Sequence, residues 1–347
     1  MSEQHSNALA AVYVQTNDAI NNEVLAFERR SDGKLGPLGQ FATGGRGTGK
    51  PHLPSQSSIV LSDDGRQLLV VNAGSDELSL FAVHNDGLRL CDRVASGGAT
   101  PTSVAVSGNL VYVLNNATPN IAGFRIDDGQ LVELDGSARP LSAEDADPAQ
   151  VSFSVDGRTL VVTERGTDSI STYAVDEHGY ATGPTTIKSS GKTPYGFGVT
   201  TDGAMIVTEA FGGAVGAAAA SSYSITGPGE LAPVSGSVGD TRSEVCWAAV
   251  TNDGRFAYVT NFGDGTISSY EIADDGVLQL RHAVAGSTRL GEKGIRDEAI
   301  TRDGSYLYAI DADAQKLFGW TVQSNGTLVS IGAFEGVPAT VAGLAAS

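Results

Sequence analysis

The sequence predicts an all-β fold: a seven-bladed β-propeller of four-stranded antiparallel blades. A short phrase centred on an aromatic residue recurs seven times, and successive aromatic residues lie 43 to 54 residues apart. These residues are Phe27, Phe81, Phe124, Tyr173, Tyr223, Tyr270 and Trp320. A fixed period in this range is typical of repeat architectures, and four short strands fit into one such unit.

Each repeat also carries two tight-turn signals around the aromatic phrase. Asp-Gly pairs such as Asp64-Gly65 and Asp253-Gly254 precede an apolar run, and a second pair such as Asp275-Gly276 follows the phrase. These dipeptides tolerate the positive φ angles of hairpin turns. Four strands joined by short turns cannot bury both faces alone, so we expect the blades to stack around an axis.

The two ends of the chain indicate how the ring closes. The first unit starts near Ala8 and lacks an innermost strand, whereas the chain finishes with an orphan half-unit that begins at Pro338. We therefore expect residues 338–346 to join residues 8–45 in the first blade, within a single domain of residues 1–347. Closure of this kind removes exposed sheet edges. The alanine-rich stretch 214–220 is expected to be a loop and the start of a strand rather than a helix.

The composition of the chain argues against some classes of partner. The formal net charge is −18, which argues against nucleic acid and anionic membranes as partners. No apolar stretch is long enough for a signal peptide or a membrane span. Cys91 and Cys246 fall in different repeats, so a cytoplasmic location is expected. We expect the partner to be a small-molecule substrate. We expect the protein to be a monomer or a weak homo-oligomer.

No cofactor or metal is expected. The segment Gly44–Lys50 matches a phosphate-loop pattern, but Pro51 follows where Ser or Thr and a helix are required. Cysteine and histidine do not recur at metal-ligand spacing.

The repeat predicts where a site would lie. The Asp-Gly turn joins the first two strands of a blade at one face, so the start of the first strand and the end of the second meet at the other face. The predicted starts include Lys50-Pro51-His52, Asp147–Gln150, Thr193–Tyr195, Glu244–Trp247 and Arg296–Glu298. The predicted ends are Asn17, Asn72, Asn115, Glu164-Arg165, Glu209, Asn261 and Asp311.

Three residues of this face are candidate catalytic groups. Asn and Asp at strand ends usually cap turns, but Glu164 and Glu209 break that pattern and suggest a general base. Surface pairing with Arg165 is the plainer interpretation of Glu164. His52 is the third candidate, as a base or an oxyanion donor, although a histidine at such a position is more often a solvated turn residue.

The remaining candidates would bind the substrate. They are Arg165, Gln150, Tyr195, Trp247 and Arg296. Trp247 could stack on a ligand ring, or pack between blades. Arg296, within Arg296-Asp297-Glu298, suits anion recognition or an internal salt-bridge cluster. Cys246 as a nucleophile would need a base beside it, and the sequence indicates none.

The chain resembles the lactonase-type seven-bladed propeller family, which includes bacterial 6-phosphogluconolactonase and fungal carboxy-cis,cis-muconate cyclase. Tyr258-Val259-Thr260-Asn261 matches the YVTN-type repeat, and Gly166–Ile170 and Cys246–Thr251 also carry the resemblance. The family's P-H-x-H segment corresponds to Pro148–Val151 here and its P-R-H segment to Pro194–Gly196, so both sets of histidines are absent. Glu209 lies close to the family's glutamate.

Two classes of function remain open. The resemblance implies an enzyme of carbohydrate metabolism: a hydrolase of a small lactone or sugar lactone with a carboxylate base, or a related cyclase or isomerase. The missing histidines favour a non-catalytic propeller that serves as a binding or scaffold module.

Overall fold

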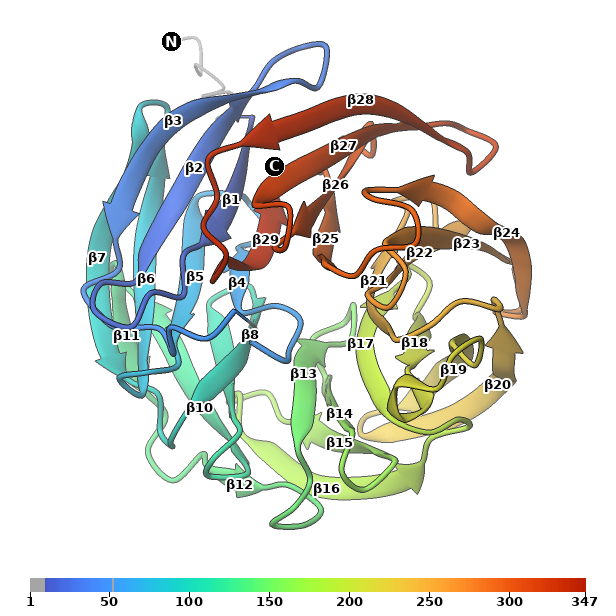
Figure 1. Cartoon of the computed structure of the whole chain (residues 1–347). Helices are drawn as coiled ribbons and strands as arrows, with labels where there is room; N and C mark the ends of the chain where they lie inside the picture. The colour runs from blue at the N-terminus through green and yellow to red at the C-terminus, as the bar shows by residue number, and fades with distance from the viewer. Residues whose placement is uncertain (1–9, 52) are drawn as a thin grey trace, which may run out of the picture.

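The computed structural model describes residues 10–51 and 53–347, which form a ring of seven antiparallel sheets (Figure 1). Each sheet is one blade, with its first strand beside the central axis and its last strand at the rim. The predicted seven-bladed propeller is therefore confirmed. Within the described residues, the one helical segment is a short 3-10 turn, Phe211–Gly213, and no helix is long and apolar enough to cross a membrane.

The strands of the first three blades have the following bounds, from the axis outward. Blade 1 contains β29 (Ala342–Ala346), β1 (Ala11–Gln15), β2 (Glu23–Arg29) and β3 (Leu35–Ala42). Blade 2 contains β4 (Ile59–Leu61), β5 (Gln67–Asn72), β6 (Glu77–His84) and β7 (Gly87–Ala95). Blade 3 contains β8 (Pro101–Ser107), β9 (Leu110–Asn115), β10 (Asn120–Asp127), β11 (Gln130–Glu133) and the short β12 (Arg139–Pro140).

Blades 4 to 7 repeat the same order. Blade 4 contains β13 (Pro148–Phe153), β14 (Thr159–Glu164), β15 (Ser169–Val175) and β16 (Ala181–Lys188). Blade 5 contains β17 (Pro194–Val199), β18 (Ala204–Glu209), β19 (Ala219–Gly227) and β20 (Glu230–Gly239). Blade 6 contains β21 (Val245–Val250), β22 (Phe256–Asn261), β23 (Thr266–Ile272) and β24 (Leu278–Ser287). Blade 7 contains β25 (Ile295–Ile300), β26 (Tyr306–Asp311), β27 (Lys316–Val322) and β28 (Leu328–Glu335).

Ring closure follows the expectation. β29 pairs antiparallel with β1, with Tyr13 opposite Ala345 and Val14 opposite Leu344 (Figure 1). The closing strand spans Ala342–Ala346, a shorter segment than residues 338–346. The stretch 214–220 is also as expected, since its first residues form a loop and β19 begins at Ala219.

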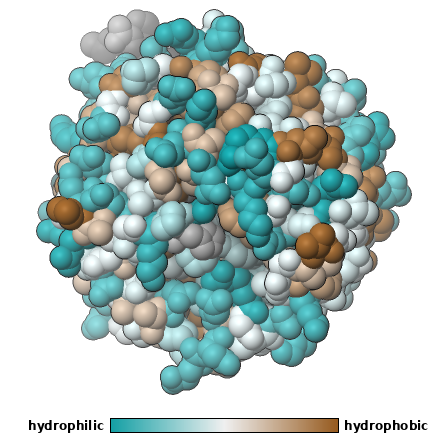
Figure 2. Space-filling model, in the orientation of Figure 1, coloured by the Kyte–Doolittle hydropathy of each residue, from teal (hydrophilic) through white to brown (hydrophobic). Residues whose placement is uncertain are grey.

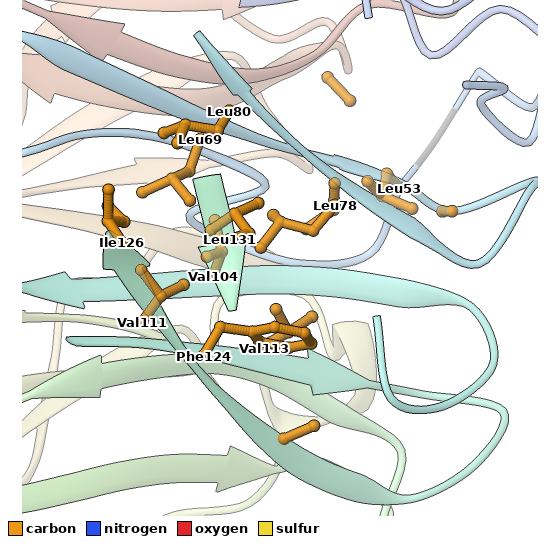
Figure 3. Packing of buried hydrophobic residues seen from close by; sticks show 14 residues of the cluster. Leu53, Leu69, Leu78, Leu80, Val104, Val111, Val113, Phe124, Ile126 and Leu131 are labelled. Carbon is orange, nitrogen blue, oxygen red and sulfur yellow. The ribbon is translucent and has the colours of Figure 1, made fainter. Parts of the chain in front are cut away.

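The repeated aromatic residues are buried in the third strand of every blade, where they fill the space between neighbouring sheets. Between blades 2 and 3, for example, Leu69 and Leu80 face Val104, Val113 and Phe124 in one cluster (Figure 3). Burial of this kind contributes roughly 1.5–3 kcal/mol for each large apolar side chain. The stacking of sheets therefore supplies the core that no single blade could form.

Tyrosine hydroxyls form hydrogen bonds, or ties, between neighbouring blades. Tyr112 in β9 donates to the Gly179 carbonyl of blade 4 at 2.9 Å, and Tyr258 in β22 donates to the Gly326 carbonyl of blade 7 at 3.1 Å. Tyr308 in β26 donates to the Gly33 carbonyl of blade 1 at 2.5 Å. In each tie a second-strand tyrosine reaches the last hairpin turn of the next blade.

One expectation about blade 2 is wrong. Its first strand was expected to start at Lys50-Pro51-His52, but β4 begins at Ile59. The chain before it, Leu53–Ser57, instead crosses the central channel, and we call this segment the strap. Gln56 N–H donates to the Ala149 carbonyl in blade 4 at 3.0 Å. The Gln56 amide also bonds both backbone groups of Ala248 in blade 6, at 2.8 and 3.1 Å.

Blade 5 makes room for the strap with a glycine. A Cβ at Gly196 would lie 2.0 Å from Gln56 Oε1 and 2.7 Å from the Cys246 carbonyl oxygen. In blade 4 the neighbouring contact is made by Gln150, which accepts from Phe197 N–H at 2.6 Å. Gln56 thus bonds the inner strand of blade 6 as Gln150 bonds that of blade 5, because Gly196 in blade 5 has no side-chain amide.

The surface carries no large apolar patch on the face in Figure 2, where hydrophobic side chains form small separate spots among hydrophilic ones. The most exposed large apolar residues, Val215, Ile20 and Leu290, come from three different loops. The apolar side chains on this face therefore do not form one continuous patch.

Candidate functional site

The predicted meeting of first-strand starts and second-strand ends is confirmed by the strand register. Pro148 pairs with Glu164, Pro194 with Glu209, and Ile295 with Asp311. On this face, loops and strand starts of blades 4 to 7 enclose a hollow of about 420 Å³, which we call the pocket. Four predicted residues line it together: Arg165, Tyr195, Trp247 and Arg296.

Tyr195 and Trp247 form one wall of the pocket. Their ring centroids lie 5.5 Å apart with the rings inclined at 60°. Trp247 Nε1 donates to the Ser55 carbonyl of the strap at 2.9 Å, which fixes the indole. The buried Tyr195 hydroxyl has no hydrogen-bond partner in the described structure. Burial raises the pKa of Tyr195 well above its usual value, so the phenol stays neutral.

Two arginines reach the pocket from different blades. Arg165 follows β14 and donates to Asp147 Oδ1 at 2.6 Å, with its guanidinium 4.9 Å from the Tyr195 ring centroid. Arg296 is the second residue of β25, and its guanidinium lies 5.4 Å from the Phe262 ring centroid. Burial lowers the pKa of Arg296, and the nearby Asp313 carboxylate opposes that shift. Two cations over aromatic rings are suited to hold an anion.

The pocket also contains groups that sequence analysis did not select. Asp147 and Glu244 line it, as does Phe262. Both acidic residues are ion-paired, Asp147 with Arg165 and Glu244 with Lys293 at 3.0 Å. Their signal was present in the sequence, because each precedes a first strand; in the structure both have positive φ. Burial raises the pKa of the Cys246 thiol to about 12, so this pocket residue is not an activated nucleophile.

A long loop forms another wall. Residues 210–218 join β18 to β19, whereas four residues join the corresponding strands in blades 2, 3, 4, 6 and 7. Gly212 and Gly213 lie in the pocket wall, and both have positive φ angles, of 63° and 80°. Blade 5 therefore has extra chain over the pocket, and the alanine-rich composition of the loop gave no indication of this.

The structure does not bring Glu164 and Glu209 into the pocket. Glu209 is fully buried and accepts hydrogen bonds from Gly191 N–H at 2.7 Å and from the hydroxyls of Ser221 and Ser237 at 2.5 and 2.6 Å. Each bond joins the second strand of blade 5 to a neighbouring segment. A carboxylate saturated in this way is suited to a structural role.

Glu164 is placed in the same way in blade 4. It is fully buried, accepts from Thr167 Oγ1 at 2.9 Å and from Ser171 Oγ at 2.6 Å, and accepts two bonds from Ser142. In blade 2 the equivalent residue is Asn72, whose amide bonds Ser79 and Thr43. Glutamate and asparagine thus fill the same hydrogen-bonding role at these strand ends.

Two further candidates lie elsewhere. Gln150 is buried between blades 4 and 5, where its amide exchanges bonds with both backbone groups of Phe197, and it does not line the pocket. His52 lies outside the described residues. Within residues 10–51 and 53–347, no group of three or more histidine, cysteine, aspartate or glutamate side chains could hold a metal ion.

A family pattern and several solved structures resemble this chain. The pattern of the family described as lactonase, 7-bladed β-propeller matches residues 10–139, 131–210 and 208–340. A putative 6-phosphogluconolactonase from Bacteroides fragilis shares 18% identity over 99% of both chains, with a TM-score of 0.72. The periplasmic gluconolactonase PpgL of Pseudomonas aeruginosa shares 18% identity over 97% of this chain and 99% of its own, with a TM-score of 0.74. A comparison with curated proteins gave no match.

Proposed function

Because this chain belongs to the lactonase family of seven-bladed β-propellers, we propose that it hydrolyses a small lactone, and that the pocket of blades 4 to 7 binds it. One observation carries the proposal: Arg165 and Arg296 line the same 420 Å³ hollow beside the Tyr195 and Trp247 rings. A hollow of that size lies within the range of small-ligand sites. An oxygenated ring with an anionic substituent, such as an acidic sugar lactone, matches this combination.

The chemistry would use these groups as follows. Water attacks the lactone carbonyl carbon, a C–O bond forms, the ring C–O bond breaks, and a hydroxy acid results. Negative charge develops on the carbonyl oxygen during attack, and a guanidinium stabilises it. The flat rings would cover the apolar face of the substrate. The second arginine would then hold the anionic substituent. The carboxylate of the product would stay beside the first guanidinium, so it would need no further partner.

The general base remains a carboxylate in this proposal, but we assign it to the pocket. Asp147 and Glu244 are the acidic residues that line the hollow, whereas Glu164 and Glu209 are saturated outside it. Water activated by either pocket carboxylate would approach a substrate held by Arg165 and Arg296. The two carboxylates are tested separately, by one variant of each.

A second candidate function has its own supporting observation. Both pocket carboxylates are already ion-paired, and burial raises the pKa values of Tyr195 and Cys246, so the phenol and the thiol stay neutral. This combination suits a binding module for a small anion. The two candidates share the ligand class and differ in turnover.

The test is a panel of sugar lactones, aliphatic lactones and muconates, with acid release followed by a pH indicator and binding followed by thermal shift. Arg165→Gln and Arg296→Gln are expected to lower kcat/KM by roughly 10²-fold or more. Arg281→Gln is the matched control, because Arg281 pairs with Glu271 on the exposed rim. Binding without turnover would support the second candidate. Neither binding nor turnover across the panel would overturn both.

We also propose a cytoplasmic location. Cys91 is exposed, Cys246 is buried, and both are free thiols. An exposed free thiol is better suited to a reducing compartment. Fractionation of the native host, with antibody detection in cytoplasmic and envelope fractions, tests this location directly.

A further inference from the structure

A second hollow occupies the central channel on the far side of the strap from the pocket. It measures about 710 Å³ and is lined by the inner strands of all seven blades. Gln56 and Ser57 of the strap lie at its inner end, and Asp63 and Arg302, which follow the ends of β4 and β25, lie at the opposite end. The hollow is therefore a well whose inner end the strap covers, and we call it the well.

Two adjacent acidic residues of β25 line the inner part of this well. Asp297 and Glu298 are each 3% exposed. Asp297 Oδ1 accepts the Glu298 N–H at 3.0 Å, but Asp297 Oδ2 and both Glu298 carboxyl oxygens make no hydrogen bond of normal geometry. The Leu344 N–H of blade 1 acts on Asp297 and the Ala249 N–H of blade 6 on Glu298, and each lowers the pKa of its carboxyl. Buried carboxyl oxygens are costly unless a ligand, an ion or water satisfies them.

The other lining residues define what such a ligand can be. Valines from five blades, Val60, Val106, Val155, Val199 and Val250, alternate with hydroxyls such as Ser57 and Ser152. Among the ionisable side chains that line the well, three are carboxyls and one, Arg302, is a cation. Because the whole chain also carries a net charge of −18, the field favours entry of a cation.

Size and ligand number argue for an organic cation. The well is far larger than a metal ion requires and lies within the range of organic ligand sites. A hard metal ion needs six or more oxygen ligands, and the described residues contain no group of three acidic, histidine or cysteine side chains that could hold one. An ammonium group, in contrast, is satisfied by two or three acceptors.

We propose that the well binds a primary aliphatic amine, with its ammonium group between Asp297 and Glu298 and its hydrocarbon chain along the valines. The ammonium donates to Asp297 Oδ2 and to the Glu298 carboxyl oxygens, and the methylene groups lie along the apolar wall. The site is independent of the pocket, because the strap separates the two hollows and no residue lines both.

Binding should be linked to proton release. Burial raises the pKa of Asp297 to about 8 and that of Glu298 well above its usual value, so protonation of these carboxyls competes with binding of a cation. An ammonium requires their charged forms, so affinity should increase as pH rises toward 8. The other titratable groups near the pair are Tyr258 beside Glu298, and Asp63 and Arg302 farther along the well.

The experiment is calorimetry with n-butylamine and 1,4-diaminobutane at pH 6, 7 and 8, in buffers of different ionisation enthalpy. We expect saturable binding that releases protons, and a loss of affinity of at least tenfold in Asp297→Asn and in Glu298→Gln. 1-Butanol has the same chain without the charge and should not bind. Arg165→Gln, a pocket variant, should bind amines as the wild type does, which separates this proposal from the lactone site.

Several results would overturn the proposal. Equal binding of butanol and butylamine would show that the charge is irrelevant. Binding of calcium but not of amines would point to a metal site instead. Unchanged amine affinity in both variants, with folding verified by circular dichroism, would remove Asp297 and Glu298 from any site. Asp63→Asn, farther along the well, serves as the matched variant and should weaken binding less than either inner substitution.

Discussion

Inner strands of the ring line both the pocket and the well, yet the two hollows differ in whether their charged side chains are ion-paired. In β25, Arg296 lines the pocket, and the next two residues line the well. Pocket charges are paired, as Asp147 with Arg165 and Glu244 with Lys293. The carboxyls of the well lack such partners. A pocket ligand can therefore exchange partners with existing ion pairs, whereas a ligand of the well must bring the missing charge itself.

The largest expected effect concerns pH and the well. The pKa of Asp297 rises from 3.8 when unfolded to about 8 when folded. Between these values the native state keeps a proton that the unfolded state has lost, so wild-type stability falls as pH rises from about 4 to about 8. The total is on the order of several kcal/mol. Asp297→Asn should lack this contribution, so the difference in Tm between variant and wild type should change in the variant's favour as pH rises.

Scanning calorimetry of both proteins from pH 4 to pH 9 checks the prediction. Asp128→Asn, in an exposed turn, is the control and should follow the wild type. A constant difference in Tm across that range would mean that Asp297 titrates normally and that the two hollows do not differ in this way.

The next effect concerns the wall between the hollows. Gly196→Ala would place a Cβ 2.0 Å from Gln56 Oε1, and the carbonyl oxygen of Cys246 blocks the other side. Relief requires the strap to shift and give up its bonds to Ala248, at a cost of about 3 kcal/mol in unfolding free energy. Gly236→Ala is the control, because its Cβ would meet Ser190 at 3.5 Å, an ordinary contact. Denaturant titration that finds equal stability for both variants would contradict the role of the strap.

A smaller effect separates structural carboxylates from pocket ones. Glu209→Gln places an amide nitrogen among donors, so one bond, such as that from Gly191 N–H, is lost at about 2 kcal/mol. Stability should fall while ligand affinity of the pocket stays the same. Thermal melts and lactone titrations together check this, with the exposed Glu230→Gln as control. Lost turnover at unchanged Tm would instead restore Glu209 as the base.

The smallest stability effect falls in the pocket itself. Arg165→Lys keeps the charge and loses the fork that contacts Asp147, so unfolding free energy should change by less than about 1 kcal/mol. Anion affinity should fall more than stability does, because lysine cannot bind an anion through two parallel hydrogen bonds. A variant that loses stability but keeps affinity would assign Arg165 to the scaffold.

The sequence predicted the ring because the period and the turn dipeptides are local signals that repeat seven times. It also predicted the convergence of Arg165, Tyr195, Trp247 and Arg296, because blade topology converts sequence position into place on a face. The strap could not be predicted this way, since its side-chain contacts join Gln56 to Ala248, 192 positions away. The interpretation of Glu164 and Glu209 assumed that an unusual residue type indicates function. The structure places them in networks that Asn72 serves elsewhere with a shorter side chain.

Ring closure through β29 has a consequence for biosynthesis. β1 is translated before the other described strands of the ring, but its inner partner spans Ala342–Ala346 and is translated after all of them. At about 5–20 residues per second, β1 waits roughly 15–70 s for that partner. During this interval its inner edge is open to the β29 segment of any neighbouring nascent chain. Crowded polysomes should therefore favour strand-exchanged dimers, and slow, dilute expression should favour closed rings.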